Sequence, residues 1–208
     1  MKKYLLLVVL ALFPIALYSQ NNDLFLQEEG KHLTFRDVPI DGSLRAFTSQ
    51  IEAKGFTLVY TPSDNSGAAF TGKFIGKEVT LLVITSPKTR TVWKVAVDFG
   101  DQRSWYSLKS DYRDLKNSLS VKYGIPTSYE YFRSPYEEGD GYEMTAIYAE
   151  KCVYVSYFDV KENDKVVGTI ALSIEKHDTQ GYVSLRYEDA VNASMASSEK
   201  NANIYDEL

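Results

Sequence analysis

Two stretches of the chain repeat one order of features, in which an apolar helical stripe ends at a glycine and strand-like runs follow. In "LRAFTSQIEAKGF", Leu44, Phe47 and Ile51 recur at spacings of three and four, and Gly55 comes after them. This spacing gathers apolar side chains on one side of a helix, and a glycine provides the left-handed backbone that ends one. We predict a helix here, with Asp41 as its N-cap.

The second stretch, "WYSLKSDYRDLKNSLSVKYGI", carries a longer stripe at the same spacings. Its apolar members are Trp105, Leu108, Tyr112, Leu115 and Leu119. Gly124 and Pro126 then stop the pattern, because glycine favours a helix end and proline cannot continue a helix. We predict a second helix that packs on the strands that follow it.

Alternating apolar and polar residues, the period of a half-buried strand, follow each helix. We expect four strands after the first helix, in residues 56–60, 68–74, 79–86 and 91–99. We expect five after the second, in residues 128–133, 142–149, 151–160, 166–175 and 182–188. The alternation places three sets of side chains on shared strand faces: Trp93, Val95, Val97 and Phe99; Ile170, Leu172 and Ile174; and Val183, Leu185 and Tyr187. In the first run we expect Phe56 and Leu58 to be buried.

The predicted fold class is α+β, with two tandem helix-plus-antiparallel-meander units whose helices pack on one face of antiparallel sheet. Residues 32–100 form the first unit and residues 101–188 the second. Residues 189–208 have few large apolar side chains, so we predict a flexible tail. The order of elements repeats, although sequence identity between the units is too low to establish a duplication.

The first residues have the layout of a secretory signal peptide. In "MKKYLLLVVLALFPIALYSQ", two lysines precede an apolar run that is shorter than the roughly 20 helical residues needed to span a bilayer. We predict a signal peptide at residues 1–19, a lead segment at residues 20–31, and export to the periplasm or the extracellular space. No cysteine follows the apolar run, so a lipid anchor has no attachment atom there. We expect no membrane span in the mature chain.

Charge and cysteine content narrow the class of protein. Removal of Lys2 and Lys3 with the signal leaves 21 basic against 28 acidic residues, a formal charge of -7. Nucleic-acid binding needs a concentrated basic face, and the basic residues are scattered, so we expect no nucleic-acid partner. Cys152 is the single cysteine and cannot form an internal disulfide, so an ordinary core must stabilise the fold. A chain of this size can bury roughly 68–70% of its unfolded surface, which is sufficient.

At "VPIDGSLRAFTSQIEAKGF" the chain resembles modules shared by the BamE-type outer-membrane assembly lipoproteins and the β-lactamase inhibitory proteins. In these modules a small helical element precedes antiparallel strands and can occur in tandem. "HLTF", "VPIDG" and the ending "DEL" also resemble an uncharacterised family of secreted proteins from gut bacteria, over residues 31–188. The chain lacks the disulfides of the inhibitors and the lipidated cysteine of the lipoproteins. The resemblance implies no activity and no functional residue.

No residue pattern predicts catalysis, a metal site or a cofactor. Cys152 and His177 are the only thiol and imidazole in the second unit, and a nucleophile needs a base within hydrogen-bond reach. A buried, inert thiol is the commoner state of a strand cysteine. The histidines lack zinc spacing, and the acidic turns at residues 136–142 and 161–165 lack the ordered loop of strong calcium sites. We predict that the chain is not an enzyme; a hydrolase built on the thiol and imidazole is the weaker alternative.

Tyrosines supply the candidate binding residues, because interfaces are enriched in Tyr, Trp and Arg. The candidates are Tyr129, Tyr131, Tyr142, Tyr148, Tyr182 and Arg186. Alternation puts the first two on one strand face and the next two on another. Tyrosine is also an ordinary residue of a half-exposed sheet, and this structural alternative stays open. Trp93 and Trp105 lie on apolar faces, so we assign both to the core.

The leading functional hypothesis is an exported, non-enzymatic domain that recognises a protein or an envelope component through a tyrosine-rich sheet face. The absence of catalytic motifs and the tyrosine-rich strands support it together. A glycan-binding or small-molecule-binding protein is the alternative, because aromatic side chains also stack on sugar rings. No partner or ligand can be named from these patterns.

Overall fold

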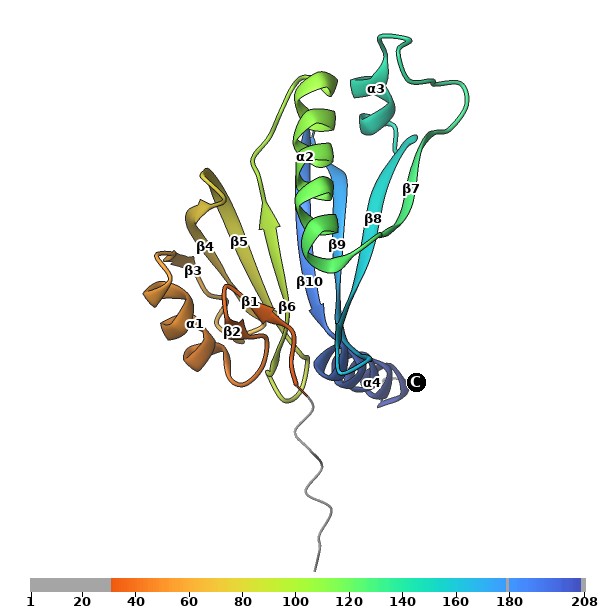
Figure 1. The fold of residues 1–208 in the computed structure, drawn as a ribbon. Helices are drawn as coiled ribbons and strands as arrows, with labels where there is room; N and C mark the ends of the chain where they lie inside the picture. Colours follow the sequence, from red (N-terminus) through yellow and green to blue (C-terminus); the bar gives the residue numbers. More distant parts are fainter. Residues whose placement is uncertain (1–30, 179, 207–208) are drawn as a thin grey trace, which may run out of the picture.

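The computed structural model describes residues 31–178 and 180–206, apart from the side chains of residues 203, 205 and 206 (Figure 1). The predicted signal peptide lies outside the described residues, as does all but the last residue of the predicted lead segment. Within the described part of the chain, no helix combines the length and the hydropathy that a membrane crossing requires.

One antiparallel sheet of eight strands organises the described chain. In chain order the strands are β3 (Thr57–Tyr60), β4 (Gly67–Phe74), β5 (Lys77–Thr85), β6 (Val92–Asp98), β7 (Thr127–Phe132), β8 (Cys152–Glu162), β9 (Lys165–His177) and β10 (Gln180–Asp189). Across the sheet the order is β3-β4-β5-β6-β10-β9-β8-β7, so the first four strands and the last four each form a meander. The meanders meet where β6 pairs with β10, with Val97 opposite Leu185. Both predicted units therefore share one sheet.

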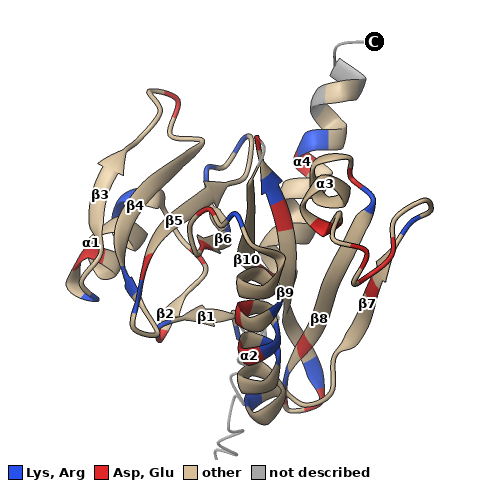
Figure 2. Cartoon of the chain, turned by 90° about the horizontal axis from the view of Figure 1, so that it is seen from above, with Lys and Arg blue, Asp and Glu red and all other residues tan. Residues whose placement is uncertain are grey.

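Helices and a small hairpin flank this sheet. The helices are α1 (Leu44–Ala53), α2 (Trp105–Tyr123), α3 (Glu143–Tyr148) and α4 (Ala190–Asp206), and the hairpin consists of β1 (Thr34–Phe35) and β2 (Val38–Pro39). The first helix, the hairpin and α2 lie on one side of the sheet, whereas α4 extends on the other (Figure 2). The predicted α+β class, with a large antiparallel sheet, is confirmed.

The core fills the space between the sheet and the helices in front of it. One row of core side chains crosses five strands in register: Phe70, Leu81, Val97, Leu185 and Leu172. Each is at most 1% exposed. Phe47 and Ile51 of α1 and Leu108 of α2 are fully buried in the same cluster. The predicted apolar stripes of both helices are thus confirmed.

Ser43, rather than Asp41, caps α1. The Ser43 Oγ accepts a hydrogen bond from the Ala46 backbone N–H at 3.3 Å. The Asp41 carboxylate instead accepts a hydrogen bond from Asn192 Nδ2 at 2.9 Å. The predicted cap was wrong because a tertiary contact, invisible in the local sequence, takes up the Asp41 side chain.

Residues 143–148, predicted as a strand, form the short helix α3, so four strands rather than five follow α2. Its consecutive residues Ala146 and Ile147 are both buried. A helical turn can bury two neighbours, whereas a strand sends them to opposite faces. Ile147 and Leu108 both approach Gly181, where an added Cβ would come within 3.5 Å and 2.6 Å of them. Close packing against β10 therefore decides the conformation of this segment.

The predicted flexible tail is helical over residues 190–206 and packs against β6, β9 and β10. Asp189, which is 0% exposed, accepts a hydrogen bond from the Asn192 N–H at 2.9 Å and so caps the first turn of α4. Farther along, Ala196 is buried, and Glu199 accepts hydrogen bonds from Thr89. Polar contacts therefore hold a helix that offers little apolar surface.

Two apolar residues assigned to the core are more exposed than expected. Leu58 is 38% exposed because β3 is an edge strand. The pairing register of β5 and β6 shifts beside Trp93, which becomes the extra residue of a bulge and is only partly buried. Trp105 does pack against the core, with its ring centroid 5.0 Å from that of Tyr154.

Candidate functional site: the open face of the sheet

The side of the sheet opposite α1 and α2 carries the candidate site, which we call the open face. It consists of the strand residues that alternate with the core residues. One row crosses seven strands in register: Thr71, Thr80, Asp98, Ser184, Ser173, Val155 and Tyr129. The next row is Ala69, Leu82, Ala96, Arg186, Ala171, Tyr157 and Thr127. Because α4 begins after β10, it lies toward one end of this face (Figure 2).

The centre of the open face is a linked polar group on β6, β9 and β10. Arg186 Nη2 lies 3.1 Å from Glu175 Oε1 and donates a hydrogen bond to Ser173 Oγ at 3.2 Å. Ser173 Oγ in turn donates to Glu175 Oε1 at 2.7 Å. On the adjacent strand pair, Ser184 Oγ donates to Asp98 Oδ1 at 2.9 Å. The rigid sheet therefore presents charged groups in fixed positions.

Asp98 is the most perturbed carboxyl of this group. Burial raises its pKa above the ordinary value, and the nearby Glu175 charge adds to the rise, while the hydrogen bond from Ser184 opposes it. Burial also raises the pKa of Tyr182, with the charges of Asp98 and Glu175 acting in the same direction. The centre of the open face is thus partly desolvated, and the charge of Arg186 there opposes the effects of the Asp98 and Glu175 carboxylates.

Tyrosines form the β7–β8 side of the open face. Tyr129 is 51% exposed, Tyr131 is 44% exposed and Tyr157 is 41% exposed. Tyr129 lies opposite Val155 and Tyr131 lies opposite Val153, so the rings stand over an apolar strand surface. Exposed aromatic rings on a rigid strand can gain contact area on binding at low conformational cost.

Four of the predicted site residues lie on this face: Tyr129, Tyr131, Tyr182 and Arg186. They are not all adjacent, because β8 and β9 separate the first two from the last two. Tyr142 and Tyr148 do not belong to the face, since they stand at the two ends of α3. Their assignment to a strand face was wrong for the same reason as the strand itself.

Sequence reasoning missed several members of the site: Asp98, Ser173, Glu175, Ser184, Leu82 and Tyr157. A signal for them was available, because each alternates with confirmed core residues along its strand. Their meeting across the sheet required the strand order, which brings β6 beside β10.

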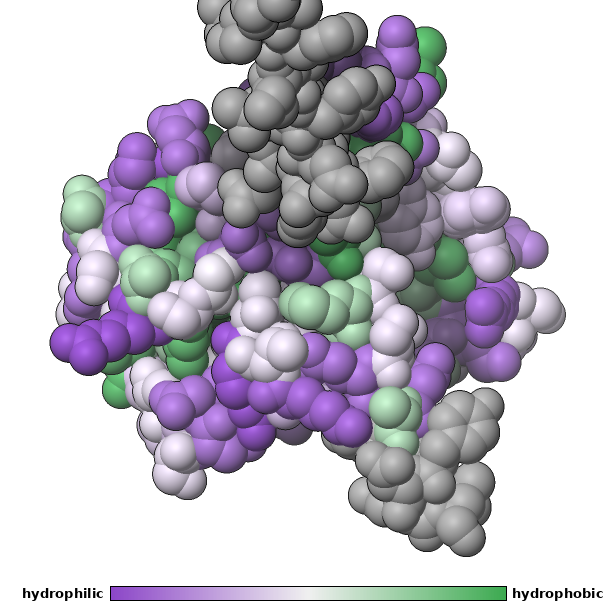
Figure 3. Space-filling model, turned by 90° about the horizontal axis from the view of Figure 1, so that it is seen from below, coloured by the Kyte–Doolittle hydropathy of each residue, from purple (hydrophilic) through white to green (hydrophobic). Residues whose placement is uncertain are grey.

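Among residues 31–178 and 180–206, the charged side chains outside the open face are mixed in sign rather than gathered into a patch of one charge. Lys and Arg positions are interleaved with Asp and Glu positions along the strands and α2 (Figure 2). Several are paired, as in Lys94 with Glu188 at 2.6 Å and Lys77 with Asp111 at 2.5 Å. Seen from below, the surface is mostly hydrophilic, with apolar side chains in small separate groups (Figure 3).

The thiol and the imidazole of the second half are not brought together. Cys152 packs against the core side of β8, and burial raises its pKa to about 12. His177 lies at the end of β9 with the alternation of the open face, and its Nδ1 is 3.0 Å from Asp101 Oδ2. This ion pair raises the pKa of the imidazole. A protonated thiol on one side of a sheet and a paired histidine on the other form no nucleophile–base pair.

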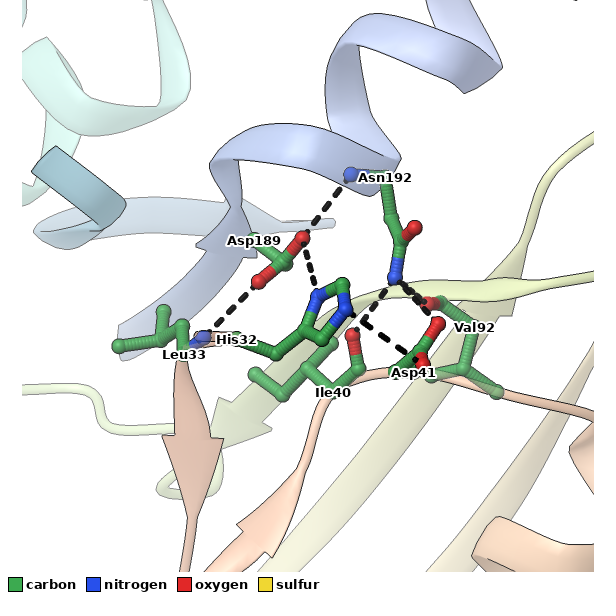
Figure 4. Close-up of polar contacts among 7 residues, drawn as sticks. All are labelled: His32, Leu33, Ile40, Asp41, Val92, Asp189 and Asn192. Carbon is green, nitrogen blue, oxygen red and sulfur yellow. Dashed lines mark hydrogen bonds and ion pairs between the residues drawn. The ribbon is translucent and has the colours of Figure 1, made fainter. Parts of the chain in front are cut away.

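A buried polar cluster joins the beginning and the end of the described chain (Figure 4). Asp189 accepts a hydrogen bond from the Leu33 N–H at 2.8 Å as well as that from Asn192. Asn192 Nδ2 also donates to the Ile40 carbonyl at 3.0 Å. His32 Nδ1 lies 3.1 Å from Asp189 Oδ1, an ion-pair distance without hydrogen-bond geometry. The hydrogen bonds of Asp189 and Asn192 therefore anchor α4 to the beginning of the described chain.

Comparison of the chain with protein-family models, with curated proteins and with solved structures finds no match. The resemblances drawn from the sequence therefore stay predictions. Among the described residues, no group of three or more His, Cys, Asp and Glu side chains is arranged to hold a metal ion.

Proposed function

We propose that the chain is an exported, non-enzymatic recognition domain that binds another protein, or an envelope component, through the open face. The observation that carries this proposal is the pair of side-chain rows that crosses seven strands and includes, on β7 and β8, the exposed Tyr129 and Tyr157. Export is inferred from the composition of residues 1–19.

The physical case for recognition is preorganisation. Helices and the hairpin cover the other side of the sheet, so the open face keeps its shape without a partner. A preformed surface loses less conformational freedom on binding than a flexible one. Its exposed tyrosines provide broad contact area, while Arg186 and Asp98 provide charges that select among partners.

We infer in addition that the fold consists of two tandem units, α1 with β3 to β6 and α2 with β7 to β10. Support comes from the strand order, in which the last strand of each unit lies at the centre of the sheet. The test is superposition in an experimental structure. Overlap of the two helices together with at least three following strands is the expected result, and failure of that overlap leaves a single irregular α+β domain.

The binding proposal is tested by site-specific photo-crosslinking in extract of the organism that encodes the chain. A photoreactive amino acid replaces Tyr129 or Leu82 on the open face, or Tyr106 as control. Tyr106 is 82% exposed on α2, on the opposite side of the sheet. We expect one discrete adduct from the two open-face positions and none from the control. No adduct, or equal adducts from all three positions, overturns the proposal.

Once the adduct is identified, binding of the purified partner is measured by calorimetry. The double variant Tyr129→Ala with Tyr131→Ala is expected to weaken binding by at least about tenfold, because large exposed aromatics carry much of an interface's energy. Its circular dichroism should match that of the original chain. If the adduct is a glycan, and the polysaccharide causes a saturable change in tyrosine fluorescence, the result favours the alternative of a glycan-binding protein.

A further inference from the structure

A pocket of about 340 Å³ lies at the end of the open face where β6 finishes. Its lining comes from four strands, β5, β6, β9 and β10, and the loop after β6: Thr80, Asp98, Gly100, Asp101, Lys176, His177 and Tyr182. This volume is near the lower end of the range for small-molecule sites, so the pocket fits one long side chain better than a large ligand.

Asp98 is the acceptor that this pocket offers. Its carboxylate accepts a hydrogen bond from Ser184 Oγ, and among the described residues no Lys, Arg or His nitrogen forms an ion pair with it. The partial burial of this carboxylate leaves its charge poorly solvated. An incoming cation would therefore gain more from this carboxylate than from one in bulk water.

The cations around the pocket are already engaged. Arg186 is held by Glu175 at 3.1 Å, and Lys176 Nζ lies 2.7 Å from Glu150 Oε1. His177 pairs with Asp101. Each of these cations therefore has a carboxylate partner of its own. The charge of Arg186 also acts on Asp98 and lowers its pKa, but without an ion-pair contact, so an incoming cation would be the first to contact the Asp98 carboxylate directly.

Tyr182 is the second recognition element of the pocket. It lies on β10 on the same side of the sheet as Ser184 and Arg186, and its side chain is half-buried. The face of a tyrosine ring attracts a cation, and its edge packs on an aliphatic stem. A carboxylate beside an aromatic ring suits a long cationic side chain, whose two parts need different surroundings.

We infer that the partner of the open face inserts a lysine or arginine side chain into this pocket, with its charged group at Asp98 and its stem along Tyr182. The inference rests on the proposed function and specifies the chemistry of the partner. It also assigns Asp98 a recognition role that is separate from the contacts of Tyr129 and Tyr131.

The test uses small probes, so that it does not depend on identifying the partner. Nα-acetyl-lysine methylamide and Nα-acetyl-arginine methylamide are titrated into the 15N-labelled chain, with Nα-acetyl-glutamine methylamide as the neutral probe. We expect saturable shifts of the amide signals of residues 98–101 and 182 with the two cations, and none with the neutral probe. High salt should weaken the effect, since exposed charge interactions are screened.

Asp98→Asn tests the carboxylate, because the amide oxygen can still accept from Ser184 while the charge is lost. The matched control is Asp159→Asn, on an exposed residue of β8 that faces the same side. We expect at least a threefold weaker probe affinity in the first variant and an unchanged affinity in the second. Equal affinities in both variants, or equal shifts with the neutral probe, overturn the inference.

The two proposals fail in different ways. Crosslinks at Tyr129 together with no cation shift at Asp98 refute the cation pocket and leave the recognition face standing. Cation shifts at Asp98 together with no crosslink from any open-face position support the pocket and refute the recognition face as the site of a macromolecular partner.

Discussion

Both halves of the sheet bury apolar rows on the core side, but they differ on the open side. In the first half, β3 to β6, the open-face rows carry Thr71, Thr80, Leu82 and Ala96. In the second half, β7 to β10, the same rows carry Tyr129, Tyr157, Ser173 and Arg186. Core positions in both halves must be apolar to stabilise the fold, but open positions are free to differ. The exposed tyrosines of the proposed recognition face therefore lie in the second half, whereas Asp98, the acceptor of the proposed cation pocket, lies on β6 in the first.

The halves also differ beneath their helices. Under α1 the packing is apolar, with Phe47 and Ile51 fully buried. Under α2 the Tyr112 hydroxyl lies 2.6 Å from Ser156 Oγ and donates to Glu130 Oε1 at 3.1 Å. A buried polar group is stabilising only when its hydrogen-bond partners are present. The stability of the second half should therefore depend on these hydrogen bonds, whereas the packing under α1 does not.

The largest effect should come from the cores of the two halves. Phe47→Ala and Leu108→Ala each remove a fully buried side chain, so we expect losses of about 3–5 and 2–5 kcal/mol in the free energy of unfolding. Arg45→Ala, on the exposed side of α1, should change it by no more than about 0.5 kcal/mol. Urea unfolding measures all three. A single unfolding transition would show that the two halves unfold as one cooperative unit. Two separate transitions would show that the halves unfold as independent domains.

The next effect concerns α4, which follows the second meander and packs against β6, β9 and β10. Asp189→Ala removes a fully buried carboxylate and leaves the Leu33 and Asn192 N–H groups without their acceptor. We expect a loss of about 2–4 kcal/mol and faster amide exchange in α4. Glu188→Ala, which breaks an ion pair with Lys94, should cost about 1 kcal/mol or less. Equal losses in the two variants would contradict an anchoring role.

A smaller effect should distinguish the polar packing under α2 from the apolar packing under α1. Tyr112→Phe keeps the ring and removes the hydroxyl that meets Ser156, so we expect a loss of about 1 kcal/mol. Tyr129→Phe removes an exposed hydroxyl and should stay within about 0.5 kcal/mol. Chemical unfolding of both variants under one condition is the measurement. An unchanged Tyr112→Phe would show that the second core does not depend on its polar contacts.

The smallest effect is a gain, and it has a defined pH dependence. Because burial raises the pKa of Asp98 in the folded protein, the folded state holds its proton more tightly than the unfolded state. Unfolding free energy contributed by this group therefore falls as pH rises from the unfolded pKa through the folded one. We expect Asp98→Asn to be slightly more stable than the original chain at pH 7 and to lose that advantage below about pH 4, near the unfolded value.

Thermal unfolding at pH 7 and below about pH 4 checks the direction of the stability change in Asp98→Asn, with Asp159→Asn as the exposed control. A variant that is less stable at pH 7 than the original chain would show that Asp98 stabilises the fold. A gain would fit a residue kept for binding at some cost in stability.

Local patterns identified most elements because each pattern needed only neighbouring residues. The spacing of Leu44, Phe47 and Ile51 requires one buried helix side wherever the helix packs. The alternation of Val183, Leu185 and Tyr187 likewise requires one buried strand face. The same reasoning predicted part of the candidate site, since Tyr129 and Tyr131 share an exposed side of β7.

Where the prediction failed, a distant contact outweighed the local pattern. The sequence by itself determined the two helical stripes, the alternating strands and a single cysteine without a partner, because periodicity and composition are properties of the chain alone. Tertiary structure decided that residues 143–148 form a helix that packs against Gly181, that Asp189 and Asn192 anchor α4, and that Asp98 lies beside Ser184. These outcomes depend on which strands become neighbours. The order of the strands depends on how the whole set of apolar core side chains is buried together, and no short segment of the sequence contains that information.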